Sequence, residues 1–145
     1  MAKLVGSLVV VTLSLASSAV VLADKTLTKT FTNRDVKGSY AFSFQGEILG
    51  AGPVAATGMF RADGRGHITD AVRTISFGAT VTQTFTCTIS VNPNGTGSAV
   101  CPLDEPIQGF PDVETFDFTL EDNAKAVRFV GTTPGFVVLG SGEKQ

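Results

Sequence analysis

The sequence has 145 residues, with 11 basic and 13 acidic side chains and a formal net charge of −2. It contains no run of basic residues, which argues against a nucleic-acid partner. Eleven Phe, one Tyr and no Trp supply apolar material for the single core that a chain of this length supports. Sixteen Gly and six Pro favour many tight turns.

The first 23 residues have the pattern of a secretory signal peptide. Lys3 supplies a positive charge, an apolar run covers residues 4–22, and the small residues before Asp24 suit cleavage. An uncleaved membrane anchor is the alternative, but Ser and Thr dilute the run and one Lys is a weak topological signal. We therefore expect an exported protein, periplasmic or extracellular, with no stable membrane anchor after cleavage.

After the signal, residues 24–36 are polar and rich in Thr, which predicts a flexible N-terminal arm. Residues 37–145 consist of short stretches of alternating polarity separated by turn residues, and no window shows helical periodicity. The expected strands cover residues 38–45, 54–61, 66–77, 81–91, 96–103, 113–120, 126–131 and 136–140. About eight strands joined by short hairpins favour a single antiparallel up-and-down barrel, with a β-sandwich as the alternative.

The two cysteines, Cys87 and Cys101, lie on either side of a Pro-Asn-Gly turn at residues 93–95. In a three-residue hairpin loop that ends in Gly, Asn92 faces Thr96, and counting outward the two cysteines face each other. Opposed Cα atoms at such a position are about 4.5 Å apart, within reach of a disulfide. A metal site would need more ligands than the chain's one histidine offers, and a catalytic redox pair has closer spacing. The hairpin therefore predicts a structural disulfide and an oxidising compartment.

Several of these turns and strands resemble those of a known group of proteins. Residues 38–42 (GSYAF), 58–68 (GMFRADGRGHI), 91–97 (VNPNGTG) and 135–140 (GFVVLG) resemble a group of exported bacterial β-barrel proteins similar to the lipocalin and allene oxide cyclase barrels. The resemblance implies a barrel over residues 37–145 and a bacterial source. The chain has no Trp, so the Gly-x-Trp signature of typical lipocalins is absent, and no cyclase catalytic residue can be transferred.

The apolar faces of the expected strands suggest a ligand-binding barrel. A Phe-rich interior with few polar groups is typical of a pocket for a small apolar or amphipathic ligand. The residues expected to line or fill it are Tyr40, Phe42, Phe44, Phe85, Phe116 and Phe118. Glu47, near the end of the aromatic strand, and Asp70, which shares a face with Ile68 and Val72, are candidate polar anchors. Arg73 also lies on a strand of mixed polarity.

Two alternatives stay open at this stage. The phenylalanines could pack against each other and leave no cavity, which would make the domain a structural or interaction module. A cyclase or isomerase could use Glu47 or Asp70 as an acid or base, because burial raises the pKa of a carboxyl group. The sequence has no catalytic triad, nucleophile elbow, metal-ligand spacing or cofactor motif, and His67 is expected to lie exposed beside its turn. We therefore expect no catalytic residue, metal or cofactor, and the oligomeric state stays open.

Overall fold

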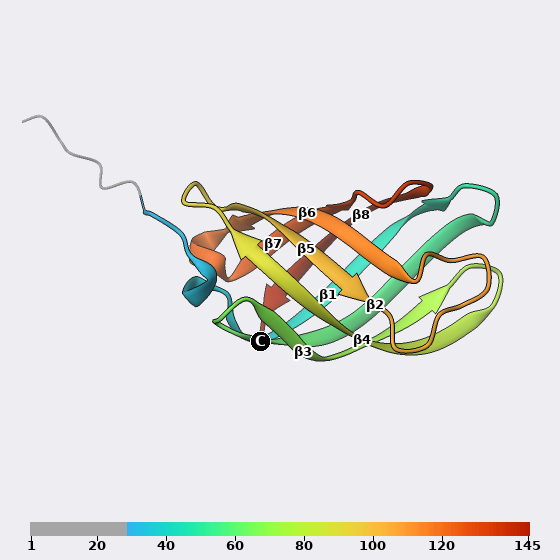
Figure 1. The fold of residues 1–145 in the computed structure, drawn as a ribbon, viewed down its shortest axis with the longest axis horizontal. Coiled ribbons are helices and arrows are strands. Elements are labelled where there is room, and N and C mark those ends of the chain that lie inside the picture. Colours follow the sequence, from blue (N-terminus) through green and yellow to red (C-terminus); the bar gives the residue numbers. More distant parts are fainter. Residues whose placement is uncertain (1–28) are drawn as a thin grey trace, which may run out of the picture.

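The computed structural model describes residues 29–145, so the predicted signal peptide lies outside the described residues. In this part of the chain eight antiparallel strands form one closed barrel, in which each strand pairs with the next and β8 pairs with β1 (Figure 1). The strands are β1 Lys37–Ile48, β2 Gly52–Asp63, β3 His67–Ser76, β4 Thr80–Val91, β5 Thr96–Pro102, β6 Val113–Glu121, β7 Ala126–Gly131 and β8 Phe136–Lys144. The predicted up-and-down barrel is confirmed.

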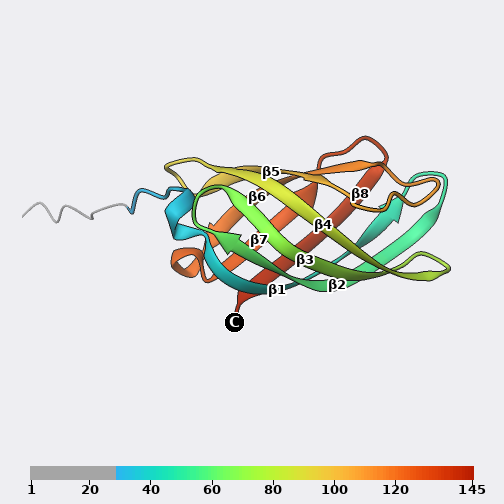
Figure 2. The ribbon, with the colours of Figure 1, turned by 60° about the horizontal axis from the view of Figure 1, so that its bottom comes forward.

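The strands run obliquely to the long axis of the barrel, as closure of a sheet requires (Figure 2). Strand β1 continues through Gly46, where the sequence pattern had suggested an end. A Cβ at Gly46 would overlap the backbone carbonyl oxygen of Val137 on β8. Gly46 therefore permits the close approach of β1 and β8 and does not end β1.

Strand β3 contains a β-bulge at Asp70, where its pairing with the neighbouring strands shifts. Asp70 has a φ of 50°, in the left-handed region. Ile68 faces inward before the bulge, and Arg73 and Ile75 face inward after it, while Val72 is exposed. The prediction that Asp70 shares a face with Ile68 and Val72 is therefore wrong, because the extra residue shifts the alternation by one.

Phenylalanine rings in the interior lie against glycines of the neighbouring strands. The direct cross-strand pairs are Phe42 with Gly58 and Gly142, Phe44 and Phe129 with Gly140, Phe116 with Gly131, and Phe118 with Gly97. A Cβ at Gly97 would overlap the Phe118 ring, and one at Gly140 would overlap the Phe129 ring. The missing side chains of the glycines thus provide the space in which the rings lie.

One end of the barrel is covered by the segment that precedes β1. This segment includes the short 3-10 helix η1 Asn33–Asp35 and lies beside the β4–β5 hairpin (Figure 1). The backbone N–H of Phe31 donates to the Pro93 carbonyl at 3.0 Å, and the N–H of Val91 donates to Asn33 Oδ1 at 2.9 Å. The segment expected as a flexible arm is therefore hydrogen-bonded to the barrel through Phe31 and Asn33.

The opposite end carries the long connection between β5 and β6, residues 103–112. Phe110 of this connection is buried, and its ring centroid lies 4.5 Å from that of Phe77. The connection is also tied to β4, because Thr84 Oγ1 donates to Asp104 Oδ2 at 2.6 Å. We call residues 103–112 the covering loop.

Candidate functional site

A cavity of about 90 Å³ remains among the side chains inside the barrel. A single water molecule needs roughly 10–15 Å³ measured in this way, so the space is several times larger than one water site. It is lined by Val36, Tyr40, Phe42, Phe44, Phe60, Ile68, Arg73, Phe85, Cys87, Ile89, Ala99, Cys101, Glu114, Phe116, Phe118, Leu120, Val127 and Phe129. All six aromatic residues expected to line or fill the interior are among these.

The aromatic rings of the lining hold one another in place. The ring centroids of Phe42 and Phe85 are 6.2 Å apart with an interplanar angle of 84°, and those of Phe116 and Phe129 are 5.5 Å apart at 87°. Such edge-to-face contacts place the positive edge of one ring against the negative face of another. The cavity wall is therefore built from side chains whose positions are set by their mutual contacts.

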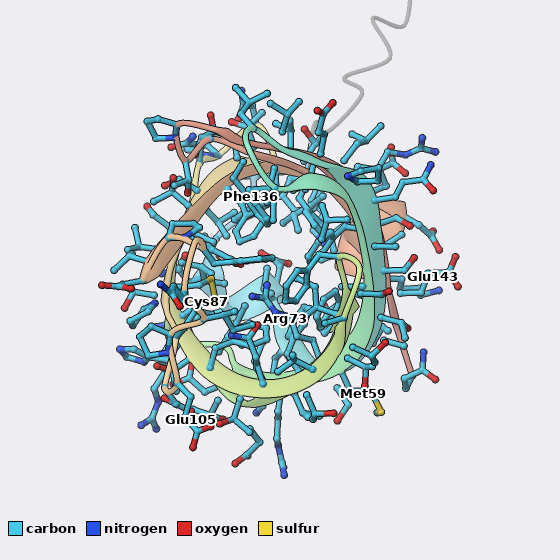
Figure 3. The ribbon with its side chains drawn as sticks, turned by 90° about the vertical axis from the view of Figure 1, so that its right-hand side faces the viewer. Met59, Arg73, Cys87, Glu105, Phe136 and Glu143 are labelled. Carbon is cyan, nitrogen blue, oxygen red and sulfur yellow. A yellow bond between two sulfur atoms is a disulfide. The ribbon has the colours of Figure 1, made fainter. Side chains whose placement is uncertain are left out.

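One ion pair lies within this apolar lining. Arg73 comes from β3 and Glu114 from β6, and their exposed fractions are only 2% and 1%. Arg73 Nη1 donates to Glu114 Oε2 at 2.6 Å, and Nη2 donates to Oε1 at 2.7 Å. Figure 3 looks into the barrel from the end that carries the covering loop and shows Arg73 in the interior.

Gln83 on β4 completes the polar cluster. Its Oε1 accepts hydrogen bonds from Arg73 Nε at 3.0 Å and Arg73 Nη2 at 2.7 Å. Its Nε2 donates to the backbone carbonyl of Glu105 in the covering loop at 3.1 Å. The buried cluster Arg73–Gln83–Glu114 is thus connected by a hydrogen bond to the segment that covers this end of the barrel.

The energetics of the pair suggest a role other than stability. Arg73 lies 5.5 Å from the Phe85 ring centroid and 5.7 Å from that of Phe44, where the ring faces attract a cation. Removing two charges from water nevertheless costs several kcal/mol per ion, and apolar residues of similar volume often stabilise a protein as well or better. The bidentate ion pair is therefore a candidate for the polar part of a binding site in the cavity wall.

Tyr40 supplies a second polar contact, near the end covered by the N-terminal segment. Its hydroxyl donates to the carbonyl of Ala124 at 2.7 Å, and its side chain is 1% exposed. Burial raises the pKa of the Tyr40 phenol above its usual value. The hydroxyl is therefore held neutral, as a donor to a backbone group.

Glu47 and Asp70, the two expected polar anchors, are exposed and do not line the cavity. Glu47 alternates with the buried Ile48, which places it on the outer face of β1. Asp70 lies at the β3 bulge. The structure does not bring either carboxylate together with the six aromatic residues.

The polar residues that do line the cavity were mostly missed in the sequence. Glu114 shares its strand face with Phe116 and Phe118, so strict alternation along 113–120 could have identified it. For Arg73 the sequence indicates only a charged residue on a strand of mixed polarity. Its inward direction depends on the bulge, which alternation within β3 alone does not reveal.

The predicted Cys87–Cys101 disulfide is present, with a Cα–Cα distance of 4.1 Å. Ile89 pairs with Ala99 as the hairpin register predicted, and the Asn92 N–H donates to the Thr96 carbonyl at 2.7 Å. Both cysteines are buried and line the cavity. A buried disulfide indicates an oxidising, exported environment.

His67 is exposed beside its turn, as expected. Its Nδ1 lies 2.9 Å from Asp63 Oδ2. The backbone N–H of Arg65 and then the His67 side chain lower the pKa of Asp63 to about 2.

Within residues 29–145 no group of three or more metal-ligating side chains gathers at one place. No helix in the described part of the chain is long and apolar enough to cross a membrane.

No protein-family model matches this chain, and comparisons with curated proteins and with solved structures give no match either. The closed eight-stranded antiparallel barrel is consistent with a lipocalin-like barrel.

Proposed function

We propose that this protein is an exported, non-catalytic barrel that binds a small apolar or amphipathic ligand in its interior. The observation that carries the proposal is the aromatic-lined cavity of about 90 Å³. Eight-stranded barrels have interiors that are either filled by side chains or hold one small ligand, and this interior is incompletely filled. The resemblance of its turns to exported bacterial barrels similar to lipocalins agrees with such a role.

The cost of the cavity supports the same role. Empty apolar space destabilises a protein by about 24 cal/mol per Å³, so this cavity corresponds to about 2 kcal/mol. A ligand that fills the space recovers the lost contacts. Since an apolar cavity of about 150 Å³ accommodates benzene, the ligand is small, unless the covering loop or the side chains move to enlarge the space.

The two alternative functions have less support. A structural module would be expected to fill its interior, and the rings leave a space although they contact each other. A cyclase or isomerase acting inside the barrel could not use Glu47 or Asp70, which are exposed. Glu114 is the carboxylate within reach, and both of its oxygens are engaged by Arg73.

A cavity-filling substitution tests the proposal. Ala99 lines the cavity from β5, so Ala99→Leu would occupy much of the space, whereas Val100→Leu enlarges an exposed side chain on the same strand. Binding of cyclopentane is followed by NMR titration of the disulfide-bonded proteins, after near-ultraviolet circular dichroism has shown that each variant folds. We expect the unmodified protein and Val100→Leu to bind and Ala99→Leu to lose binding. Equal binding by all three would place the ligand elsewhere.

A further inference from the structure

We propose that the ligand is a small uncharged carbonyl compound whose oxygen accepts a hydrogen bond from Arg73 Nη1. This inference rests on the proposed function and specifies the chemistry of the same cavity. It follows from the charge of the polar cluster, from the number of donors on Arg73 and from the lining around them.

The charge of the cluster selects an uncharged ligand. Glu114 faces Arg73 through both of its oxygens, so the pair is neutral as a unit. Among the described residues that line the cavity, Arg73 is the one cation and Glu114 the one anion. An anionic ligand would have to displace Glu114 from Arg73 and leave a buried carboxylate unpaired, whereas a cationic ligand would lie beside the guanidinium; both arrangements are unfavourable.

The donors of Arg73 select a ligand with an acceptor. A guanidinium has five N–H groups and no acceptor. Four of the five donate to Glu114 and Gln83, one from Nε, one from Nη1 and two from Nη2. Every buried side-chain nitrogen and oxygen of the described residues has at least one hydrogen-bond partner, and the one that Nη1 has is Glu114. The second hydrogen of Nη1 is therefore the donor of the cluster that remains for a ligand, and a ligand oxygen that accepts from it would be favoured over a hydrocarbon of the same shape.

The surroundings of Arg73 explain why the rest of the ligand is apolar. The Phe44 and Phe85 rings lie on the guanidinium, and the cavity continues between apolar side chains toward Leu120. A ketone, aldehyde or ester combines a strong neutral acceptor with an apolar body. Such a compound matches one remaining donor within an otherwise apolar lining.

Three compounds with the same six-heavy-atom skeleton test the inference. They are 3-methyl-2-butanone, the hydrocarbon 2,3-dimethyl-1-butene and the anion isobutyrate, and their binding to the disulfide-bonded protein is measured by NMR titration. We expect the ketone to bind about tenfold more tightly than the alkene, as one hydrogen bond to a charged donor would give. Isobutyrate should bind more weakly than either.

A variant with an apolar cluster shows whether Arg73 causes the difference. Arg73→Met combined with Gln83→Leu and Glu114→Leu removes the cluster without leaving a buried charge unpaired, so the barrel is expected to fold. This variant should bind the alkene and lose the preference for the ketone. Arg128→Met removes an arginine that is exposed on β7 and should leave the preference unchanged.

The outcomes separate the two proposals. Binding of the alkene with no preference for the ketone, or tighter binding of isobutyrate, would overturn the inference and leave the proposed function standing. Failure of all three compounds, together with cyclopentane, to bind the unmodified protein would overturn both. The affinities of the three compounds for the unmodified protein test the preference for a carbonyl ligand even if the triple variant does not fold.

Discussion

At the scale of single residues, glycine and phenylalanine form complementary pairs inside this barrel. Phe118 pairs directly with Gly97, and Phe129 with Gly140. A glycine in a strand usually weakens it, because it has no side chain to pack and loses more entropy on folding. Here the ring of the neighbouring strand covers the glycine, and such pairs accommodate five Phe of the strands in a narrow interior.

A methyl group at Gly97 tests this pairing. Gly97→Ala places a Cβ against both the Phe118 ring and the Ser90 carbonyl oxygen, so we expect a loss of about 1–3 kcal/mol in the free energy of unfolding, of which the ring accounts for part. The measurement is urea unfolding of the disulfide-bonded protein. Gly97→Ala combined with Phe118→Leu should cost less than the sum of the single changes, since the smaller side chain leaves room for the methyl group. Strictly additive effects would contradict the pairing.

Tyr40 provides a test by pH. Burial raises the pKa of its phenol, so the neutral form stabilises the folded state. The contribution of the neutral phenol to the free energy of unfolding is complete below the pKa of about 10 that Tyr has in the unfolded chain. It is lost as the pH rises through the higher pKa of the folded protein. The chain has one Tyr and no Trp, so absorbance near 295 nm reports this residue alone.

We expect the phenol in the folded protein to titrate above pH 10 and the unfolding free energy to fall in that range. Tyr40→Phe should remove this part of the pH dependence and cost about 1 kcal/mol below pH 10, because it removes the hydrogen bond to Ala124. An unshifted titration in the folded protein would contradict the burial of the hydroxyl.

At the scale of elements, the β3 bulge decides which residues reach the interior. Without the extra residue at Asp70, the alternation that begins with inward Ile68 would place Arg73 outside. The bulge therefore positions the guanidinium in the cavity wall, although Asp70 itself is exposed and does not contact the cavity.

The left-handed backbone at Asp70 makes the bulge testable. Val is a good strand residue but is disfavoured at positive φ, so Asp70→Val should destabilise the protein by about 1–2 kcal/mol. Thr74→Val changes an exposed residue on regular backbone of the same strand and should be nearly neutral. Urea unfolding compares the two variants. An equal, small effect of both changes would argue against the bulge.

The β4–β5 hairpin could be predicted from the sequence, whereas the bulge in β3 could not. The turn at residues 93–95 has strong local chemistry, so the hairpin register and the Cys87–Cys101 disulfide could be predicted and are confirmed. The strand count also followed from local alternation. A bulge at an Asp carries no comparable local signal, because it depends on pairing with β2 and β4, and this is why the outward direction of Val72 was not predicted.

The polar part of the candidate site was harder to predict for the same reason. Arg73, Gln83 and Glu114 come from three strands, and their contact depends on closure of the barrel and on the bulge. Aromatic residues at alternate positions were identified because burial of Phe is a property of one strand and its apolar face. Charged residues lie outside by default, so Arg73 and Glu114 were not expected inside. Glu47 and Asp70 were the candidates only because each lies close to apolar residues of its own strand.

At the scale of the whole molecule, the barrel has an incompletely filled interior that contains an ion pair. The N-terminal segment is hydrogen-bonded to one end (Figure 1), and the covering loop packs on the rim of the other (Figure 3). Both the cavity and the buried charges reduce stability relative to a filled apolar barrel. Their presence together supports the proposed binding function over a purely structural role.

Substitutions in the ion pair test whether the buried cluster reduces the stability of the barrel. Glu114→Leu leaves Arg73 buried without its counter-charge and should cost about 3–5 kcal/mol in the free energy of unfolding. The triple change Arg73→Met, Gln83→Leu and Glu114→Leu should be nearly neutral or stabilising by about 1–4 kcal/mol. Urea unfolding at neutral pH makes the comparison. A triple variant as unstable as Glu114→Leu would mean that the cluster exists for stability.

The measurement that tests the central claim most directly is native mass spectrometry of the protein purified from its own host, compared with its mass after denaturation. We predict an additional small mass in the native protein that is lost on denaturation, and its value would identify the ligand. A native mass equal to that of the protein alone, with no uptake from an extract of small apolar compounds, would contradict a binding function and favour a structural barrel.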